Sequence, residues 1–206
     1  MLITISRQYG AGGSEVARLV ADRLGWTVVD NEIVDRVAQR AGLAPKTVAE
    51  QDERSPGFVE RLAQALTASS QEFAVPELGV AVRAEDPNLV KLTEMVVHEI
   101  AEQGRAVLVG RAAPAVLGQS FPAIHVKLVA EKPFRIALAM REEGLDQRTA
   151  ERRLHEIDGQ RRRYHREHYG RDWDDPVHFH LTLNTGLLGL DGAADLIVHQ
   201  ARRLGW

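Results

Sequence analysis

The chain of 206 residues can form one well-buried domain, or one domain with a mobile sub-domain. Its 44% hydrophobic and 27% charged residues are those of an ordinary soluble globular protein, and a net charge of −3 argues against a nucleic-acid partner. Cysteine is absent, which excludes disulfide bonds and thiolate catalysis. No apolar run is long enough to span a membrane and no signal peptide opens the chain, so we expect a cytoplasmic protein.

The first predicted element is a strand that leads directly into a glycine-rich turn and a helix. The strand is the β-branched run 3–5, and the apolar residues of the helix share one face until Gly25 ends it. Three glycines within positions 10–13 remove the side chains that would keep a ligand away from the backbone. The amide N–H groups and the positive end of the helix can then bind an anion. The turn has the form of a phosphate-binding loop; the alternative is a tight connection that binds nothing.

The next elements continue the alternation of strand and helix. A short strand over 27–29 ends at Asp30 and completes a β-α-β unit, which predicts a parallel sheet. A helix over 31–40 carries Arg36. Prolines interrupt the segment 44–86, which is either a cover over the site or a plain insertion.

The second half of the chain adds three more strands. We expect strands at 106–109, 124–130 and 181–183. Helices are expected to begin at Pro87, at Pro133 and after Asp146. A last helix is expected to bury Ala194, Ile197, Val198, Ala201 and Leu204. Five short strands alternating with helices predict an α/β fold. The whole chain, 1–206, is therefore expected to be one domain with a three-layer, doubly wound, five-stranded parallel sheet.

Polar residues follow directly after four of these strands. They are Arg7, Asp30, Arg111 and Asn184. The carboxyl ends of parallel strands meet at one edge of the sheet, where ligands of such folds bind. We therefore expect these four side chains to lie along one rim.

The glycine turn departs from the usual phosphate-loop motif, G-x-x-x-x-G-K-[ST]. Gly12 corresponds to the second glycine and Ser14 to the hydroxyl residue, which holds a metal ion. Gly13 stands in the lysine position and Arg7 in the position of the first glycine. Arg7 is the nearest cation that could replace the lysine; the alternative is a solvated loop arginine.

The predicted helix after Asp146 is rich in arginine. It carries Arg152, Arg153, Arg161, Arg162, Arg163 and Arg166. The helix is either a lid over transferring phosphates, a solvated face, or a contact for nucleic acid. Arg161 lies on the apolar stripe and is expected to point inward, with Asp158 one turn earlier to orient it or a ribose hydroxyl.

Motifs along nearly the whole chain resemble those of the cytidylate kinase-like family, a branch of the P-loop nucleoside monophosphate kinases. In chain order they are Ile5-Ser6-Arg7-Gln8-Tyr9-Gly10-Ala11-Gly12-Gly13, Val109-Gly110-Arg111, Asp158-x-x-Arg161 with Tyr164, Asp172-Trp173-x-Asp175-Pro176, and Leu183-Asn184-Thr185. The resemblance implies a helical lid over 146–176 and a variable acceptor-side insertion over 44–86. It also implies that Arg36 and Arg111 hold a monophosphate. The chain differs from true cytidylate kinases at Gly13, Val109 and Ala112, where those enzymes have the loop lysine and two aspartates.

The leading hypothesis is an ATP-dependent phosphotransferase that uses Mg²⁺. We expect the ATP phosphates to bind to Gly10, Ala11, Gly12, Gly13, Ser14 and Glu15, and Mg²⁺ to bind to Ser14. Arg7 and Arg161 are expected to supply the catalytic charges. The acceptor is expected to bind to Asp30, Arg36, Arg111 and Asp158, and the base to lie near Asn184 and Thr185. The acceptor is a CMP-like nucleoside monophosphate or another small molecule, and the sequence leaves a homodimer open. The alternative is a nucleotide-binding regulatory protein of kinase fold with little or no turnover.

Overall fold

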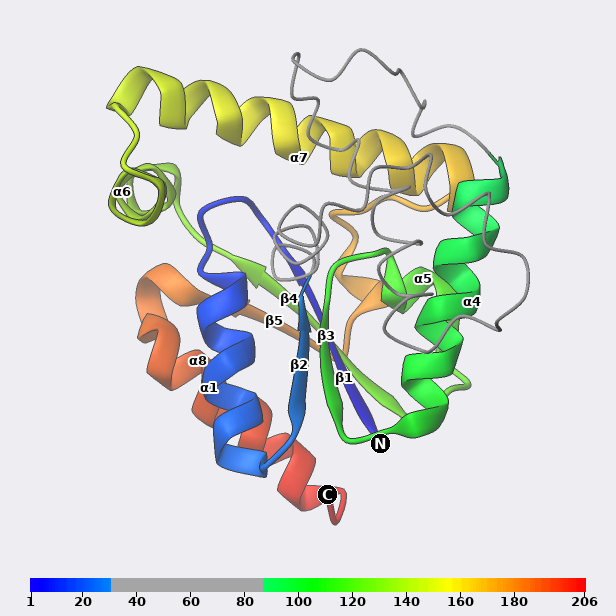
Figure 1. Ribbon diagram of the computed structural model, residues 1–206. Coiled ribbons are helices and arrows are strands. Elements are labelled where there is room, and N and C mark those ends of the chain that lie inside the picture. Colours follow the sequence, from blue (N-terminus) through cyan, green and yellow to red (C-terminus); the bar gives the residue numbers. More distant parts are fainter. Residues whose placement is uncertain (31–86) are drawn as a thin grey trace, which may run out of the picture.

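A computed structural model describes residues 1–30 and 87–206 of the chain (Figure 1). Its sheet contains the five parallel strands β1 (Leu2–Arg7), β2 (Thr27–Asp30), β3 (Ala106–Val109), β4 (Ala123–Val129) and β5 (Leu181–Asn184). Their order is β2-β3-β1-β4-β5, with β1 in the centre. The predicted fold class, a doubly wound five-stranded parallel sheet, is confirmed.

The strands that lie inside the sheet owe their form to apolar runs. All four residues of β3 are buried, as are six of the seven residues of β4. A strand with neighbours on both edges and helices on both faces has no solvent-exposed side, so β3 is apolar throughout, while β4 also buries the polar side chains of His125 and Lys127.

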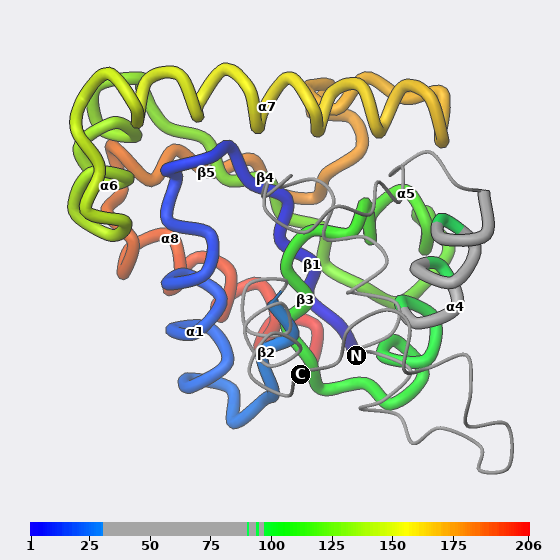
Figure 2. The backbone as a smooth tube through the Cα atoms, turned by 45° about the horizontal axis from the view of Figure 1, so that its top comes forward, coloured from blue at the N-terminus to red at the C-terminus, as the bar shows by residue number. Residues whose placement is uncertain are grey.

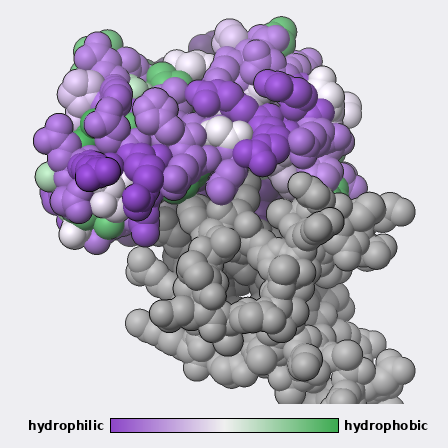
Figure 3. Space-filling view, turned by 90° about the horizontal axis from the view of Figure 1, so that it is seen from above, coloured by the Kyte–Doolittle hydropathy of each residue, from purple (hydrophilic) through white to green (hydrophobic). Residues whose placement is uncertain are grey.

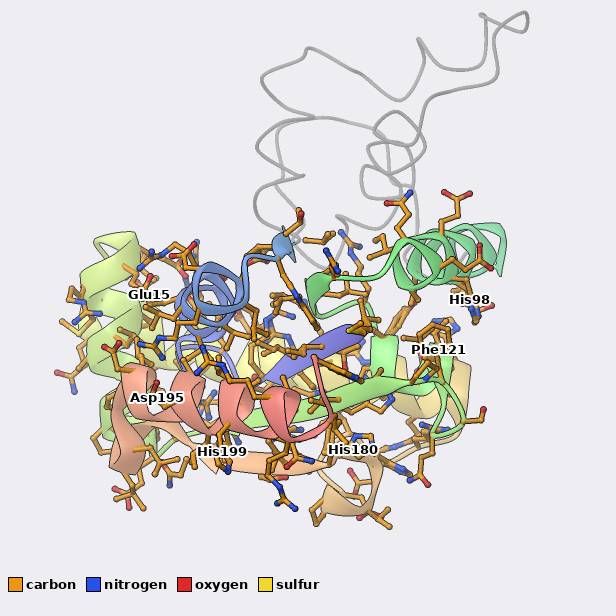
Figure 4. The ribbon with its side chains drawn as sticks, turned by 90° about the horizontal axis from the view of Figure 1, so that it is seen from below. Glu15, His98, Phe121, His180, Asp195 and His199 are labelled. Atoms are coloured by element: carbon orange, nitrogen blue, oxygen red, sulfur yellow. The ribbon has the colours of Figure 1, made fainter. Side chains whose placement is uncertain are left out.

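Helices cover the two faces of the sheet, which gives three layers (Figures 1 and 2). On one face α1 (Gly13–Leu24) packs beside α8 (Thr185–Arg203), and their apolar residues form the larger core cluster with Ile3, Ile5 and Leu128. On the other face α4 (Pro87–Gln103) and α5 (Ala113–Leu117) cover Leu2 and Leu108. Figure 4 shows this separation from below, with His98 on α4 and His199 on α8 on opposite sides of the sheet.

Two further helices lie at the carboxyl edge of the strands. α6 (Lys132–Glu143) follows β4, and the long α7 (Gln147–Tyr169) crosses above the strand ends (Figure 1). The Asp146 side chain accepts a hydrogen bond of 2.8 Å from the N–H of Thr149, so Asp146 is the N-cap of α7 as expected. The site is therefore bounded by the strand ends below and by α7 above.

Three details differ from the sequence prediction. The short helices α5 and η2 (Pro176–His178) were not predicted, because three to five residues are too few to establish a helical period. The prediction that Leu204 is buried is wrong: α8 ends at Arg203, and Leu204 is 50% exposed beyond its last turn.

The predicted helix over 31–40, the residue Arg36 and the segment 44–86 lie outside the described residues. Within 1–30 and 87–206, no helix has both the length and the apolar character needed to cross a membrane.

Candidate active site

The glycine turn lies at the carboxyl end of the central strand, between β1 and α1. Gly10 and Gly12 both have a φ of 74°, in the left-handed region that favours glycine. A Cβ on Gly10 would collide with the backbone oxygen of Arg135, and one on Gly12 with the Leu190 side chain. Two independent reasons therefore favour glycine at each position: the positive φ angle and the lack of room for a Cβ atom.

Gly13 is required for a different reason, which involves Arg7. A Cβ on residue 13 would lie 2.6 Å from Cγ of Arg7, closer than real Cβ contacts allow. The aliphatic part of Arg7 therefore fills the space into which a side chain at the usual lysine position would project. The missing lysine and the arginine at position 7 are sterically coupled.

The first turn of α1 offers unpaired backbone donors. The first N–H groups of an α-helix, here those of Gly13, Ser14 and Glu15, have no intrahelical carbonyl to bond, and they lie at the positive end of the helix dipole. The Glu15 carboxylate pairs with Arg18 at 2.7 Å, and this hydrogen bond lowers the pKa of Glu15. The turn and this helix start bring together backbone donors at the positive end of a helix, as phosphate binding requires.

Ser14 is exposed in this first turn, so its hydroxyl oxygen is accessible. Mg²⁺ binds hard oxygen donors and usually keeps several waters, with one or two protein ligands beside substrate phosphates. A single hydroxyl next to a phosphate cradle fits that requirement. No cluster of three or more histidine, aspartate or glutamate side chains that could hold a metal ion by itself occurs in the described part of the chain.

Buried side chains from α6, α7 and α8 hold the glycine turn from outside. Asp158 Oδ1 accepts from the N–H of Tyr9 at 2.9 Å, and Arg135 Nε donates to the carbonyl of Tyr9 at 2.7 Å. Arg135 and Asp158 also form an ion pair with each other. Thr185 Oγ1 donates to the carbonyl of Ala11 at 3.0 Å. The conformation of the turn is thus set by three helices that follow it in the chain.

Arg161 points inward, as the apolar stripe of its helix predicted. Its side chain is buried, and one guanidinium nitrogen donates to the carbonyl of Arg7 at 2.9 Å. The same nitrogen lies 3.5 Å from Asp158 Oδ1. The structure thus brings the two predicted catalytic arginines together at the end of β1; their catalytic role stays a prediction.

The remaining predicted residues near the turn have local structural partners. Both oxygens of Asp158 contact protein groups, and its predicted contact with an acceptor stays a prediction. Asn184 caps α8 by accepting from the N–H groups of Gly186 at 3.0 Å and Leu187 at 3.3 Å. The buried Thr185 contacts the glycine turn directly, and the predicted location of Asn184 and Thr185 near a base stays a prediction.

The predicted acceptor residues Asp30 and Arg111 come from the neighbouring strands β2 and β3 at the same edge. Asp30 is the buried last residue of β2, and Arg111 is half-buried two residues after β3. Three consecutive residues have positive φ: Gly110 at 81°, Arg111 at 56° and Ala112 at 49°. Left-handed conformations of non-glycine residues cost on the order of 1 kcal/mol each and are concentrated at functional turns. The role of Arg111 in binding an acceptor stays a prediction.

Sequence reasoning missed a buried lysine close to the site. Lys127 on β4 is 2% exposed, and its ammonium group donates to the carbonyl of Trp173 at 2.5 Å and to Asp174 Oδ1 at 3.1 Å. Burial lowers the pKa of Lys127 to about 8. The Trp173 ring N–H donates to Ser6 Oγ at 3.0 Å, which fastens the segment after α7 to β1. The available signal was a lysine within a strand whose other residues, apart from His125, are apolar.

Some of the outward-facing arginines of α7 form ion pairs with nearby acids. Arg153 pairs with Glu143, and Arg162 pairs with Asp174 at 2.6 Å. From above, the outer face of this region is mostly hydrophilic (Figure 3). The lid function of 146–176 stays a prediction; in the structure this segment contacts the glycine turn through Asp158 and Arg161.

The parallel sheet, the glycine turn at its carboxyl edge and a helix across that edge give the chain a fold that it shares with a solved shikimate kinase structure. The chain belongs to the cytidylate kinase-like family, which residues 2–187 match. Among solved structures, an uncharacterized protein from Eubacterium ventriosum ATCC 27560 is similar with a TM-score of 0.67, at 21% identity over 97% of each chain. Shikimate kinase from Bacteroides thetaiotaomicron has a TM-score of 0.50, at 12% identity over 98% of each chain. These identities establish a common fold only. No curated protein sequence matches the chain.

Proposed function

We propose that the protein is an ATP-dependent phosphotransferase that phosphorylates a CMP-like nucleoside monophosphate or a related small molecule. The observation that carries the proposal is that the Arg7 side chain occupies the space beside Gly13. Gly13 leaves the space that Arg7 fills, so a cation remains beside the glycine turn although the usual lysine is absent. An anion cradle with a retained cation is the arrangement that binding and transfer of a phosphoryl group require.

In this proposal the backbone amides from Gly10 to Glu15 bind the phosphates of ATP. The Ser14 hydroxyl holds Mg²⁺, which when bound neutralises charge on the phosphate oxygens. Arg7 and Arg161 stabilise the charge that develops on the transferred group. Phosphoryl transfer needs little covalent chemistry from the protein, so positioned charges and exclusion of water suffice.

The acceptor is proposed to bind at the rim formed by Asp30 and Arg111, with Arg36 as a further ligand. The support is that Asp30 ends β2 and Arg111 follows the adjacent strand β3, at the same edge as the glycine turn. A guanidinium group can bind a phosphate through two parallel hydrogen bonds, which suits a monophosphate acceptor. The protein is expected to act in the cytoplasm.

A direct test measures ADP release from Mg·ATP with a panel of nucleoside monophosphates and small hydroxylated acids, beside calorimetric titration with ATP. We expect binding of ATP and turnover with at least one acceptor. The absence of binding heat with ATP would overturn the proposal.

The second candidate is a nucleotide-binding regulatory protein of kinase fold. It is favoured by Val109 and Ala112, which stand where true cytidylate kinases have aspartates. Binding of ATP without phosphorylation of any acceptor in the same panel would support this candidate over the first.

A further inference from the structure

The peptide groups on both sides of Tyr9 are held by one buried ion pair. The N–H of Tyr9 donates to Asp158 Oδ1 at 2.9 Å, and the C=O of Tyr9 accepts from Arg135 Nε at 2.7 Å. Arg135 and Asp158 bond to each other through their remaining atoms, which closes a ring of hydrogen bonds. Both side chains are buried, at 8% and 3% exposed. Charged groups so far from water stay in place only with their partners, so the ring has one stable geometry.

A trans peptide is planar, with its C=O and N–H groups pointing in opposite directions. The first peptide of the turn demonstrates this: the C=O of Arg7 accepts from Arg161, and the N–H of Gln8 points the other way, to the carbonyl of Leu128 at 3.0 Å. A side chain that binds a carbonyl therefore also decides where the following amide points.

The same rule applies to the two glycine amides of the turn. Arg135 binds the C=O of Tyr9, so the N–H of Gly10 points away from Arg135. Thr185 binds the C=O of Ala11, so the N–H of Gly12 points away from Thr185. Within the described residues neither glycine N–H donates a hydrogen bond to the protein, whereas the N–H of Ala11 donates to Gln8 at 3.1 Å. The two free amides are thus each oriented by a different helix.

We propose that Arg135, with Asp158, is a positioning residue that directs the Gly10 amide toward a bound phosphate, and that Thr185 does the same for the Gly12 amide. The inference depends on the proposed function, because it assumes that a phosphate chain occupies the turn. Beyond the proposed function, the inference states that α6, α7 and α8 orient the phosphate-binding amides. They do so through two separate contacts, that of Arg135 with the Tyr9 carbonyl and that of Thr185 with the Ala11 carbonyl. Neither positioning group touches the phosphate itself.

The test follows each glycine amide by ¹⁵N–¹H NMR during titration with pyrophosphate in Arg135→Met and Thr185→Val. In the wild type both amide protons should shift downfield on binding. In Arg135→Met the Gly10 shift should be lost and the Gly12 shift kept; Thr185→Val should give the reverse. We expect each variant to bind pyrophosphate about tenfold more weakly, since a preorganised charge-stabilising donor contributes at least that factor.

Controls separate this role from general destabilisation. Arg23→Met removes a more exposed ion pair between α1 and α8, to Asp191 at 2.6 Å, and should leave both shifts unchanged. If Arg135→Met does not fold, Arg135→Lys keeps the charge toward Asp158 but has a single nitrogen in place of the two that Arg135 uses for Asp158 and for the Tyr9 carbonyl, and should also lose the Gly10 shift.

The outcomes distinguish the two proposals. Failure of the wild type to bind pyrophosphate and ATP would overturn the proposed function, and this inference with it. Wild-type binding with both glycine shifts retained, or both lost together, in the two variants would overturn the positioning role alone.

Discussion

The ammonium group of Lys127 lies 3.4 Å from the centroid of the Trp173 ring and donates to the backbone carbonyl of the same residue. This contact joins β4 to the segment that follows α7. The cation is removed from water, and the electron-rich face of the indole and the Asp174 carboxylate only partly replace its hydration. The residue should therefore make stability depend on pH in an unusual direction.

The first prediction concerns that pH dependence. Burial lowers the pKa of Lys127 in the folded state to about 8, from 10.5 in an unfolded chain. Between these values the unfolded chain binds more protons, so the contribution of Lys127 to stability rises with pH by up to about 3 kcal/mol. Urea unfolding of the wild type and Lys127→Met from pH 7.5 to 10.5 should show this rise as a growing difference. The exposed lysine variant Lys132→Met should show no such divergence from the wild type; parallel curves for Lys127→Met would reject the assignment.

The second prediction concerns restoration of the usual loop lysine. Gly13→Lys should lower stability by about 1–3 kcal/mol and weaken ATP binding, because the new Cβ collides with Cγ of Arg7. Arg7→Gly combined with Gly13→Lys should recover at least about 1 kcal/mol relative to the sum of the single changes. Thermal and urea unfolding of all four proteins measure this coupling. Strictly additive effects would show that the two positions do not share space.

The third prediction concerns the catalytic charge. Arg7→Ala should reduce turnover by about 10²-fold or more with only a modest loss of ATP affinity, since preorganised charge acts mainly in the transition state. Steady-state kinetics with calorimetric ATP binding separate the two effects. Arg202→Ala, exposed in the last turn of α8, is the matched control and should leave both unchanged. Turnover equal to wild type would remove Arg7 from the mechanism.

The fourth prediction concerns the acceptor. Arg111→Met should raise the KM for the acceptor roughly 10- to 100-fold, because hydrogen bonds between charged groups contribute about 1.5–3 kcal/mol. The KM for ATP should stay unchanged. Arg105→Met, at the opposite end of β3, provides the comparison, since it also has a positive φ and is exposed. An equal effect of both variants would contradict a specific role for Arg111.

The sequence was sufficient for the sheet and the location of the glycine turn. The strands are short segments rich in apolar and β-branched residues, and Asp146, Gly25 and Gly144 end or start helices through contacts within a few residues. Such signals can be recognised without knowing the rest of the fold. Short elements such as α5 lack a full period, and for that reason they were missed.

Only the tertiary structure revealed how the turn is held and why Gly13 replaces the lysine. Asp158 bonds to Tyr9, 149 residues away in the sequence, and Lys127 bonds to Trp173, 46 residues away. These contacts depend on the order of strands in the sheet and on the path of α7. Neither can be recognised from the local sequence around the residues that form the contacts. Local periodicity therefore determined which elements form, while packing between distant elements decided which polar groups are buried together and where the backbone amides of the turn point.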